Sequence, residues 1–141
     1  MDAATVIARL GLTPHPEGGA YRETFREPDP AGGRDRTSAI YYLLAAGEVS
    51  HWHRVDASEV WHHYTGDPLA LAISPDGVTV ERIVLGSDLA AGHRPQAVVP
   101  AWAWQSAETR GAWTLAGATV TPAFTFDGFE LAPADWAPGV S

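Results

Sequence analysis

Residues 47–66 read GEVSHWHRVDASEVWHHYTG and contain four of the six histidines of this 141-residue chain. If the stretch forms two strands joined by a turn, side chains two residues apart share a face. His51 and His53 then point the same way, and Glu59 on the returning strand can reach them. Two imidazoles and a carboxylate are a ligand set for first-row divalent metals, and they also serve general acid–base catalysis. The stretch therefore predicts a functional site.

Turn-forming residues interrupt the rest of the chain, which has 14 glycines and 11 prolines. Short runs of aromatic and β-branched residues lie between them, a pattern typical of an all-β fold. The exception is residues 2–10, where Asp2 can cap a helix that stops at Gly11. Strands are predicted at residues 20–26, 37–46 (where a short helix stays open), within 47–66, and at 69–74, 78–85, 96–99, 104–107 and 112–120. A loop or single helical turn is expected at residues 87–92. The aromatic tail at residues 124–136 is expected to pack back on the domain. Together these elements predict one jelly-roll domain over residues 1–141.

Composition excludes several classes of protein. The chain has no cysteine, which rules out disulfides, thiolate zinc sites and a cysteine nucleophile. Its formal net charge is −8 and it has no Lys/Arg-rich block, which argues against nucleic-acid binding. No apolar run approaches the roughly 20 residues of a membrane helix, and the first residues do not look like a secretory signal. We therefore expect a soluble, cytoplasmic protein.

Residues 47–66 resemble the first motif of the cupins, in which a glycine precedes His-x-His and a glutamate and a second glycine follow. Residues 92–105 resemble the second motif, with Trp102 in place of a glycine and Gln105 in place of its histidine. More narrowly, the chain resembles the DUF985 (Cupin_5) family of small single-domain cupins. The strings that carry this resemblance are Pro14-His15-Pro16-Glu17-Gly18-Gly19, Tyr21-Arg22-Glu23-Thr24, Ser38-Ala39-Ile40-Tyr41, Trp52-His53-Arg54, Glu59-Val60-Trp61-His62, Gly66-Asp67-Pro68-Leu69, Val99-Pro100 and Phe129-Glu130-Leu131-Ala132.

The resemblance implies a cupin-type jelly-roll β-barrel with a short N-terminal helix, and a homodimer. It places His51, His53, Glu59 and Gln105 at positions that match cupin metal ligands, for an Mn, Fe, Ni or Zn ion. Gln105 is a weaker ligand than imidazole, and it either binds the metal or hydrogen-bonds a backbone group or the substrate. No nucleotide cofactor is expected. The resemblance implies no settled reaction, although likeness to sugar-nucleotide epimerase cupins is the family's main functional suggestion.

The catalytic candidates are His53, Glu59 and His63. His53 and Glu59 form either the acid–base pair of a pocket or a buried hydrogen bond that only orders the sheet. His62 and His63 are neighbours, so they face opposite sides of a strand. His63 is four residues after Glu59, so on a regular strand it shares the face of Glu59 and points into the pocket. The family pattern instead has its recurring histidine at the position of His62.

Six residues are predicted to bind substrate. Arg22 could hold a phosphate or carboxylate, or form a surface ion pair instead. Arg22 and Glu23 have opposite parity, so both enter the pocket only if the strand is bent. Tyr41 and Tyr42 alternate faces, and one of them can offer a hydroxyl to the pocket. The predicted substrate-binding residues are Arg22, Glu23, Tyr41, Trp61, Trp102 and Gln105.

Three functions fit these residues. The first is an epimerase- or isomerase-like enzyme that acts on a sugar derivative or a small carbonyl or carboxylate compound, with His53 removing a proton next to a carbonyl. The second is a metal-dependent oxygenase or lyase that uses His51, His53, Glu59 and Gln105. The third is a non-catalytic protein that binds a small ligand.

Overall fold

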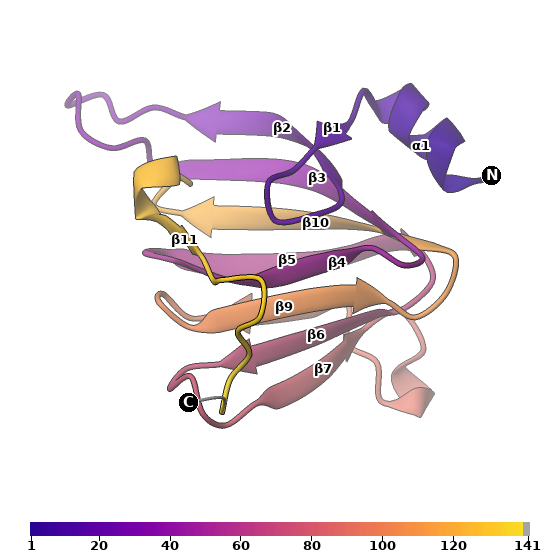
Figure 1. Ribbon diagram of the computed structural model, residues 1–141. Coiled ribbons are helices and arrows are strands. Elements are labelled where there is room, and N and C mark those ends of the chain that lie inside the picture. The colour runs from indigo at the N-terminus through magenta and orange to yellow at the C-terminus, as the bar shows by residue number, and fades with distance from the viewer. Residues whose placement is uncertain (140–141) are drawn as a thin grey trace.

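Two antiparallel sheets face each other in the computed structural model, which describes residues 1–139 (Figure 1). The six-stranded sheet has the order β1 (Thr13–Pro14), β2 (Ala20–Glu27), β3 (Thr37–Ala45), β10 (Trp113–Thr121), β5 (Ser58–Gly66) and β8 (Gln96–Val99). The five-stranded sheet has the order β11 (Phe129–Leu131), β4 (Val49–Val55), β9 (Trp104–Thr109), β6 (Leu69–Ser74) and β7 (Glu81–Leu85). The predicted all-β jelly roll is confirmed, but the two sheets pair separately and do not form a closed barrel.

The predicted N-terminal helix is α1 (Ala3–Leu10). The Asp2 side chain accepts a hydrogen bond from the Thr5 backbone N–H at 2.8 Å, which satisfies one of the free donors of the first turn. Gly11 ends the helix at φ +66°, a conformation that suits glycine. Val6 is buried in a cluster that includes Leu43 and Leu115, so the helix covers the outer face of the six-stranded sheet at one end.

The main core lies between the two sheets. Tyr42 and Trp61 project from the six-stranded sheet, and Leu71 and Ile73 project from the five-stranded sheet to meet them. The side chain of Trp61 is 1% exposed, which is the burial expected of an inward position in a two-layer fold. A second cluster around Val55, Val120 and Phe129 lies at another level of the strands, and a cavity forms beside it.

Three strand pairs contain register shifts that break the two-residue alternation. On β2 the shift lies between Glu23 and Phe25, so Thr24 is an extra residue. Phe25 then pairs with Ala39, next to the inward-facing Ile40, and is 53% exposed. Strict alternation along the strand predicted at residues 20–26 places Tyr21, Glu23 and Phe25 on one face, and for Phe25 this expectation is wrong. The other shifts lie between Ser50 and His53 on β4 and around Tyr64 on β5.

The loop between β1 and β2 places Glu17 in the interior. Gly18 has φ +112°, and a Cβ there would lie 2.1 Å from the Val49 carbonyl oxygen. Only glycine allows this close approach of two backbones. The His51 backbone N–H donates to the Glu17 carbonyl at 2.9 Å, which fixes the loop against β4.

Most of the predicted strands are present within a residue or two of their expected bounds. The strand predicted at 37–46 is β3, and the helix alternative there is wrong. The strand predicted at 78–85 starts only at Glu81, because the Asp76 carboxylate accepts from the backbone N–H groups of Val78 and Thr79 and holds a turn. The sequence did not predict β1, and it left 87–92 open between a loop and the 3-10 turn η1 (Leu89–Ala91).

The aromatic tail packs back as expected, through the 3-10 turn η2 (Phe126–Gly128), β11 and Trp136, whose ring centroid lies 4.6 Å from that of Trp104. Among residues 1–139, no helix combines the length and apolar character needed to cross a membrane.

Candidate functional site

A cavity of about 580 Å³ is lined by residues of the β1–β2 loop, of β2, β3, β4, β5 and β10, and of the segment that leads into η2. Figure 1 shows where these elements lie in the fold. Its walls include Ile40, Val55, Ala118, Val120 and Phe124. Polar side chains gather elsewhere on its surface: His15, Glu17, Tyr21, Ser38, His53 and Glu59 in the interior, and Thr13, Arg22, Glu23, Arg26 and Thr125 nearer the mouth. This is the size of a cleft that binds a compact small molecule.

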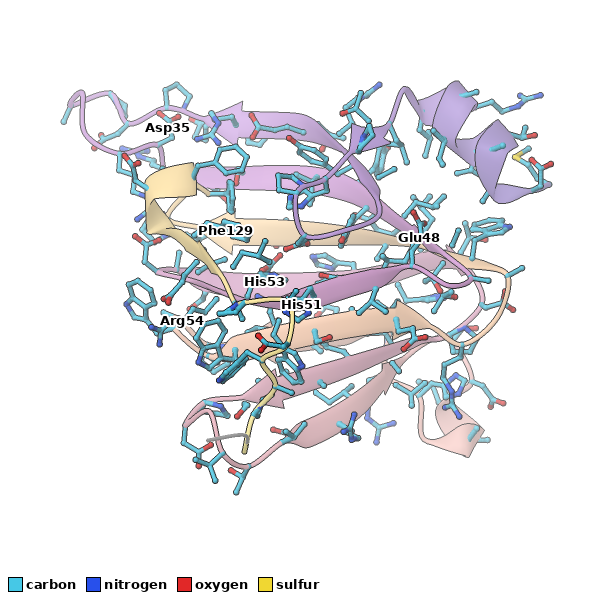
Figure 2. The ribbon with its side chains drawn as sticks, in the orientation of Figure 1. Asp35, Glu48, His51, His53, Arg54 and Phe129 are labelled. Carbon is cyan, nitrogen blue, oxygen red and sulfur yellow. The ribbon has the colours of Figure 1, made fainter. Side chains whose placement is uncertain are left out.

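His53 and Glu17 form an ion pair in this cavity. The distance from His53 Nε2 to Glu17 Oε2 is 2.8 Å, and both side chains are almost completely buried. The other ring nitrogen, Nδ1, lies 2.8 Å from the His51 carbonyl oxygen. A carbonyl can only accept, so Nδ1 carries a proton and Nε2 shares a second proton with Glu17. Figure 2 shows His53 on β4 close to Phe129 of the C-terminal segment.

The electrostatics of the pair favour the charged forms. Burial by itself would lower the pKa of His53, but the charge and hydrogen bond of Glu17, with a contribution from Glu59, raise it to about 9. Burial would raise the pKa of Glu17, yet the charge and hydrogen bond of His53 lower it below its usual value. At neutral pH the pair is therefore an imidazolium and a carboxylate.

Glu59 lines the same cavity without a cation bonded to it. Its Oε1 accepts a hydrogen bond from Gln105 Nε2 at 2.8 Å, and no hydrogen bond to its Oε2 is formed within residues 1–139. Burial raises the pKa of Glu59 to about 7, because the opposing charge of His53 only partly offsets the loss of solvation. Glu59 is thus a carboxyl group that can both take and give a proton near neutral pH.

The Gln105 amide has a fixed orientation. The Trp61 indole N–H donates to Gln105 Oε1 at 2.8 Å, and an indole nitrogen can only donate. The amide NH₂ must therefore face Glu59, and the carbonyl oxygen is already used. Trp61 and Gln105 are not among the residues that line the cavity. They were predicted to touch the substrate, but the structure places them behind Glu59, where they hold its carboxyl group.

His51 does not reach the cavity. The register shift between Ser50 and His53 adds a residue to β4, so the alternation that would align His51 with His53 is broken. The His51 ring instead lies with Nε2 2.9 Å from the Pro133 carbonyl oxygen of the C-terminal segment. Figure 2 shows the two histidines on β4. The expectation that both rings point the same way is wrong.

The histidine pair on β5 is also outside the cavity. His63 pairs with Ala116 and has inward parity, as predicted, but its Nε2 lies 3.2 Å from the Asp67 carbonyl oxygen. His62 faces the other way, with Nε2 3.4 Å from Thr119 Oγ1. The structure therefore brings neither of them to His53.

Of the other predicted substrate-binding residues, only Glu23 and Arg22 border the cavity. Glu23 binds Arg26 through both carboxylate oxygens at 3.0 Å. Arg22 donates to the Leu10 carbonyl at 2.9 Å, and its guanidinium carbon lies 5.9 Å from the centroid of the Tyr41 ring. Tyr41 itself lies on the outer face, since Tyr42 is the inward tyrosine.

Trp102 lies on the outside of the five-stranded sheet. It is 50% exposed, and the Arg54 guanidinium carbon lies 5.3 Å from the centroid of its ring. It does not line the cavity, so its predicted role in binding the substrate is not supported by its position.

Sequence reasoning did not select Glu17, His15 or Tyr21 for the site, and it left Tyr42 as the alternative to Tyr41. Tyr42 donates a short hydrogen bond to the Gly18 carbonyl, and His15 Nδ1 accepts from the Glu17 backbone N–H at 3.1 Å. The Gly-Gly pair after Glu17 was the available signal, because adjacent glycines mark a close approach of backbone. That signal identifies the loop but not where its glutamate points.

The predicted metal ligands do not assemble. His51 lies outside the cavity, the Gln105 carbonyl is bonded to Trp61, and both ring nitrogens of His53 are bonded. Among residues 1–139, no group of three or more His, Asp or Glu side chains has the geometry to hold a metal ion. The donor set therefore does not fit the predicted His/His/Glu/Gln centre, and we derive no step through a metal.

Solved structures show the same fold. A protein from Shewanella oneidensis is 42% identical, with a TM-score of 0.87 over 94% of this chain and 85% of that one. A hypothetical protein from Leishmania major is 28% identical, with a TM-score of 0.85 over 94% of this chain and 88% of that one. A dTDP sugar isomerase from Desulfovibrio desulfuricans is 14% identical, with a TM-score of 0.62 over 84% of this chain and 83% of that one, which shows the fold alone. No curated protein matches the chain significantly.

The jelly roll is the fold of the cupin superfamily. The family model "Cupin superfamily (DUF985)" matches residues 4–132, which is most of the chain. The protein belongs to this DUF985 (Cupin_5) family, as the sequence motifs indicated.

The raised pKa of Glu59 predicts a specific dependence of stability on pH. In the unfolded chain this carboxyl loses its proton near pH 4.5, and in the folded protein near pH 7. Between these values the folded state holds a proton that the unfolded state has lost, so stability falls as pH rises. The total loss from this group is about 3 kcal/mol. The variant Glu59→Gln keeps an acceptor for Gln105 but cannot ionise, so it should lack this loss in urea unfolding curves from pH 4.5 to 8.

The matched control is Glu81→Gln, an exposed carboxylate on β7. It should keep the wild-type slope of unfolding free energy against pH. If Glu59→Gln also keeps the wild-type slope, Glu59 is ionised throughout this range and the protonation assigned to it is wrong.

Proposed function

We propose that this cupin binds a small carbonyl compound in its cavity and moves a proton at the carbon next to the carbonyl, as an isomerase- or epimerase-like enzyme. The observation that carries the proposal is the arrangement of Glu59 and the His53–Glu17 ion pair, which line the same cavity. A carboxyl group that titrates near neutral pH is suited to general acid–base catalysis. The sugar isomerase neighbour adds only the shared fold to this argument.

Glu59 is the base in this proposal. Its carboxylate takes the proton from the carbon next to the carbonyl, the C–H bond breaks, and the electron pair moves to the carbonyl oxygen to give an enolate. In an epimerisation, a water molecule in the cavity gives a proton to the other face of the same carbon, and the protonated Glu59 loses its proton to solvent. In an isomerisation of an α-hydroxycarbonyl compound, Glu59 returns its proton to the neighbouring carbon as the hydroxyl proton moves to the former carbonyl oxygen. The positive charge of His53, in a cavity of low dielectric, stabilises the developing negative charge.

His53 was the base in the hypothesis drawn from sequence. Its hydrogen bonds argue for a different role, because Nδ1 donates to the His51 carbonyl and Nε2 is occupied by Glu17. An imidazolium without a free lone pair cannot accept a proton. Glu17 therefore keeps His53 charged, and Glu59 remains as the group that exchanges protons.

Proton exchange into simple ketones tests the reaction. Wild-type protein in D₂O, incubated with hydroxyacetone and with 4-phenyl-2-butanone, should accelerate deuterium incorporation next to the carbonyl of at least one of them, as measured by NMR. The rate should rise with pH through about 7, as Glu59 ionises. Glu59→Gln should lower the rate by about 10²-fold or more, since it removes the base.

Glu81→Gln is the control and should exchange at the wild-type rate. A folded Glu59→Gln protein with unchanged exchange would reject Glu59 as the base. If wild-type protein accelerates exchange of neither probe, the proposed reaction is rejected and a binding role for the cavity is favoured.

We also propose that the chain forms a homodimer through the outer face of the six-stranded sheet. This face carries Phe25, Tyr64 and Val98, whose side chains are all at least half exposed. The register places them outward, since Phe25 pairs with Ala39 and Val98 pairs with Val60. Exposed large apolar side chains on one face of a sheet are typical of a surface that another protein covers.

Native mass spectrometry tests this pairing. We expect a species of twice the 15.0 kDa chain mass, and Val98→Glu should shift it to the monomer, because it places a charge in the interface. Val78→Glu, a substitution at an exposed valine in the β6–β7 turn, should leave the dimer intact. A wild-type monomer at micromolar concentration would contradict the proposal.

A further inference from the structure

Two polar side chains of the cavity wall, Arg26 nearer the mouth and Ser38 in the interior, are already bonded to the protein. Arg26 donates to Glu23, to Asp35 and to the Phe124 carbonyl, all within 3.0 Å. Ser38 Oγ accepts from the Phe124 backbone N–H at 3.0 Å. Most of the N–H groups of Arg26 are therefore used within the protein, and Ser38 keeps its hydroxyl donor for a ligand.

The walls between mouth and interior are apolar. Ile40, Val55, Ala118 and Val120 present only hydrocarbon to the cavity. A hydroxyl group placed against them would lose its hydrogen bonds to water without replacement, at about 1–3 kcal/mol for each group. A polyhydroxylated sugar is therefore a poor fit to this part of the cavity, and an alkyl or aryl group is a good one.

The interior disfavours a ligand that brings its own negative charge. Two carboxyl groups, Glu17 and Glu59, line it, against the single positive charge of His53. Both N–H groups of His53 are bonded, to the His51 carbonyl and to Glu17, so the imidazolium has no donor left for a ligand carboxylate. Glu59 Oε2 is a free position, and it can donate to a neutral acceptor when Glu59 is protonated. The Tyr21 hydroxyl and the His15 ring, whose pKa burial lowers, also line the cavity as uncharged hydrogen-bonding groups.

We propose that the ligand places an uncharged carbonyl group beside Glu59 and an apolar body against the walls formed by Ile40, Val55, Ala118 and Val120. This rests on the proposed function and narrows it: the substrate class is a ketone or a related neutral carbonyl compound with an alkyl or aryl chain. Sugars and simple carboxylates, which the sequence left open, are disfavoured.

A set of probes of nearly equal size tests the ligand class by binding alone. The set is 3-phenylpropanamide, 3-phenylpropanoate, 3-phenylpropylamine as its ammonium ion, and methyl α-D-glucoside. Dissociation constants come from titrations followed by ¹H–¹⁵N NMR at pH 7, where shifts at the lining residues show that the probe is in this cavity. We expect the amide to bind at least about ten times more tightly than each of the other three probes.

Each other outcome overturns the inference. If the carboxylate binds more tightly than the amide, the cavity is an anion site. If the ammonium ion binds more tightly, it is a cation site, and if the glucoside does, it is a sugar site. Absence of binding by the amide up to about 10 mM also overturns it. This test is independent of the test of the reaction. If the probes bind in the expected order but the protein does not accelerate deuterium exchange into ketones, the ligand class is supported and the catalysis is rejected.

A different observation carries a second inference, which concerns His51. Its backbone N–H donates to the Glu17 carbonyl at 2.9 Å, and its backbone carbonyl lies 2.8 Å from His53 Nδ1. Its ring nitrogen Nε2 lies 2.9 Å from the Pro133 carbonyl oxygen. One residue therefore contacts both members of the ion pair through its backbone and the C-terminal segment through its side chain.

The C-terminal segment is itself fixed to the outside of the five-stranded sheet. The Ala132 backbone N–H donates to the Trp52 carbonyl at 2.9 Å. The Trp136 ring packs edge-on to Trp52, with centroids 6.3 Å apart, and closer to Trp104. These contacts hold Pro133 where the His51 ring can reach it.

We infer that His51 is a positioning residue, through which the C-terminal segment holds the ion pair in place. The variants His51→Ala and Trp136→Ala test this, with His62→Ala, a histidine on the other sheet, as the control. NMR titration of the His53 ring gives its pKa directly, without a substrate. The charged and titratable groups that face His53 are Glu17, Glu59 and His15, and none of them is changed in these variants.

We expect the pKa of His53 to fall by about half a pH unit or more in His51→Ala, because a displaced His51 backbone weakens the contacts to both His53 and Glu17. Trp136→Ala should change it in the same direction and less. His62→Ala should not change it. An unchanged titration of His53 in folded His51→Ala and Trp136→Ala proteins would overturn the inference, whatever the fate of the proposed reaction.

Discussion

The hydrogen-bonded ion pair between His53 and Glu17 is the interaction on which the rest of the site depends. It places two charges in a nearly dry interior, an arrangement that is stable only if both partners are held at bonding distance. The tight turn at Gly18 holds one of them, and the irregular part of β4 holds the other. The raised pKa of Glu59 is linked to this pairing. Burial raises it, and the charge of His53, which is hydrogen-bonded to Glu17, offsets the effect of burial only in part.

The fold could be predicted from the sequence because it follows from local patterns. The capped helix at Asp2, the turn at Asp76-Gly77 and the alternating strands all rest on interactions between residues close in the chain. The orientation of single side chains could not be predicted as well. Parity arguments failed for Phe25 and for His51, because one extra residue in a strand reverses every orientation beyond it.

The partner of His53 shows a second limit. Glu59, six residues away, has the spacing of a hairpin partner, and the sequence predicted a direct pair. The structure instead joins His53 to Glu17, 36 residues earlier. Which glutamate reaches the ring is decided by how the β1–β2 loop closes over the cavity, and such long-range placement leaves no periodic signal. The sequence did select the imidazole and one of the two carboxyl groups that line this cavity.

Trp61 belongs both to the hydrophobic core and to the site. Its ring packs among the most buried side chains, and its N–H orients the amide that holds Glu59. The packing of the interior and the proton-transfer group are therefore not independent modules, and a change that loosens one disturbs the other. Residues such as Phe126 and Thr13 also line the cavity, but they take no part in the contacts from Trp61 through Gln105 to Glu59. Substitutions at these positions can therefore change the ligand without disturbing the core.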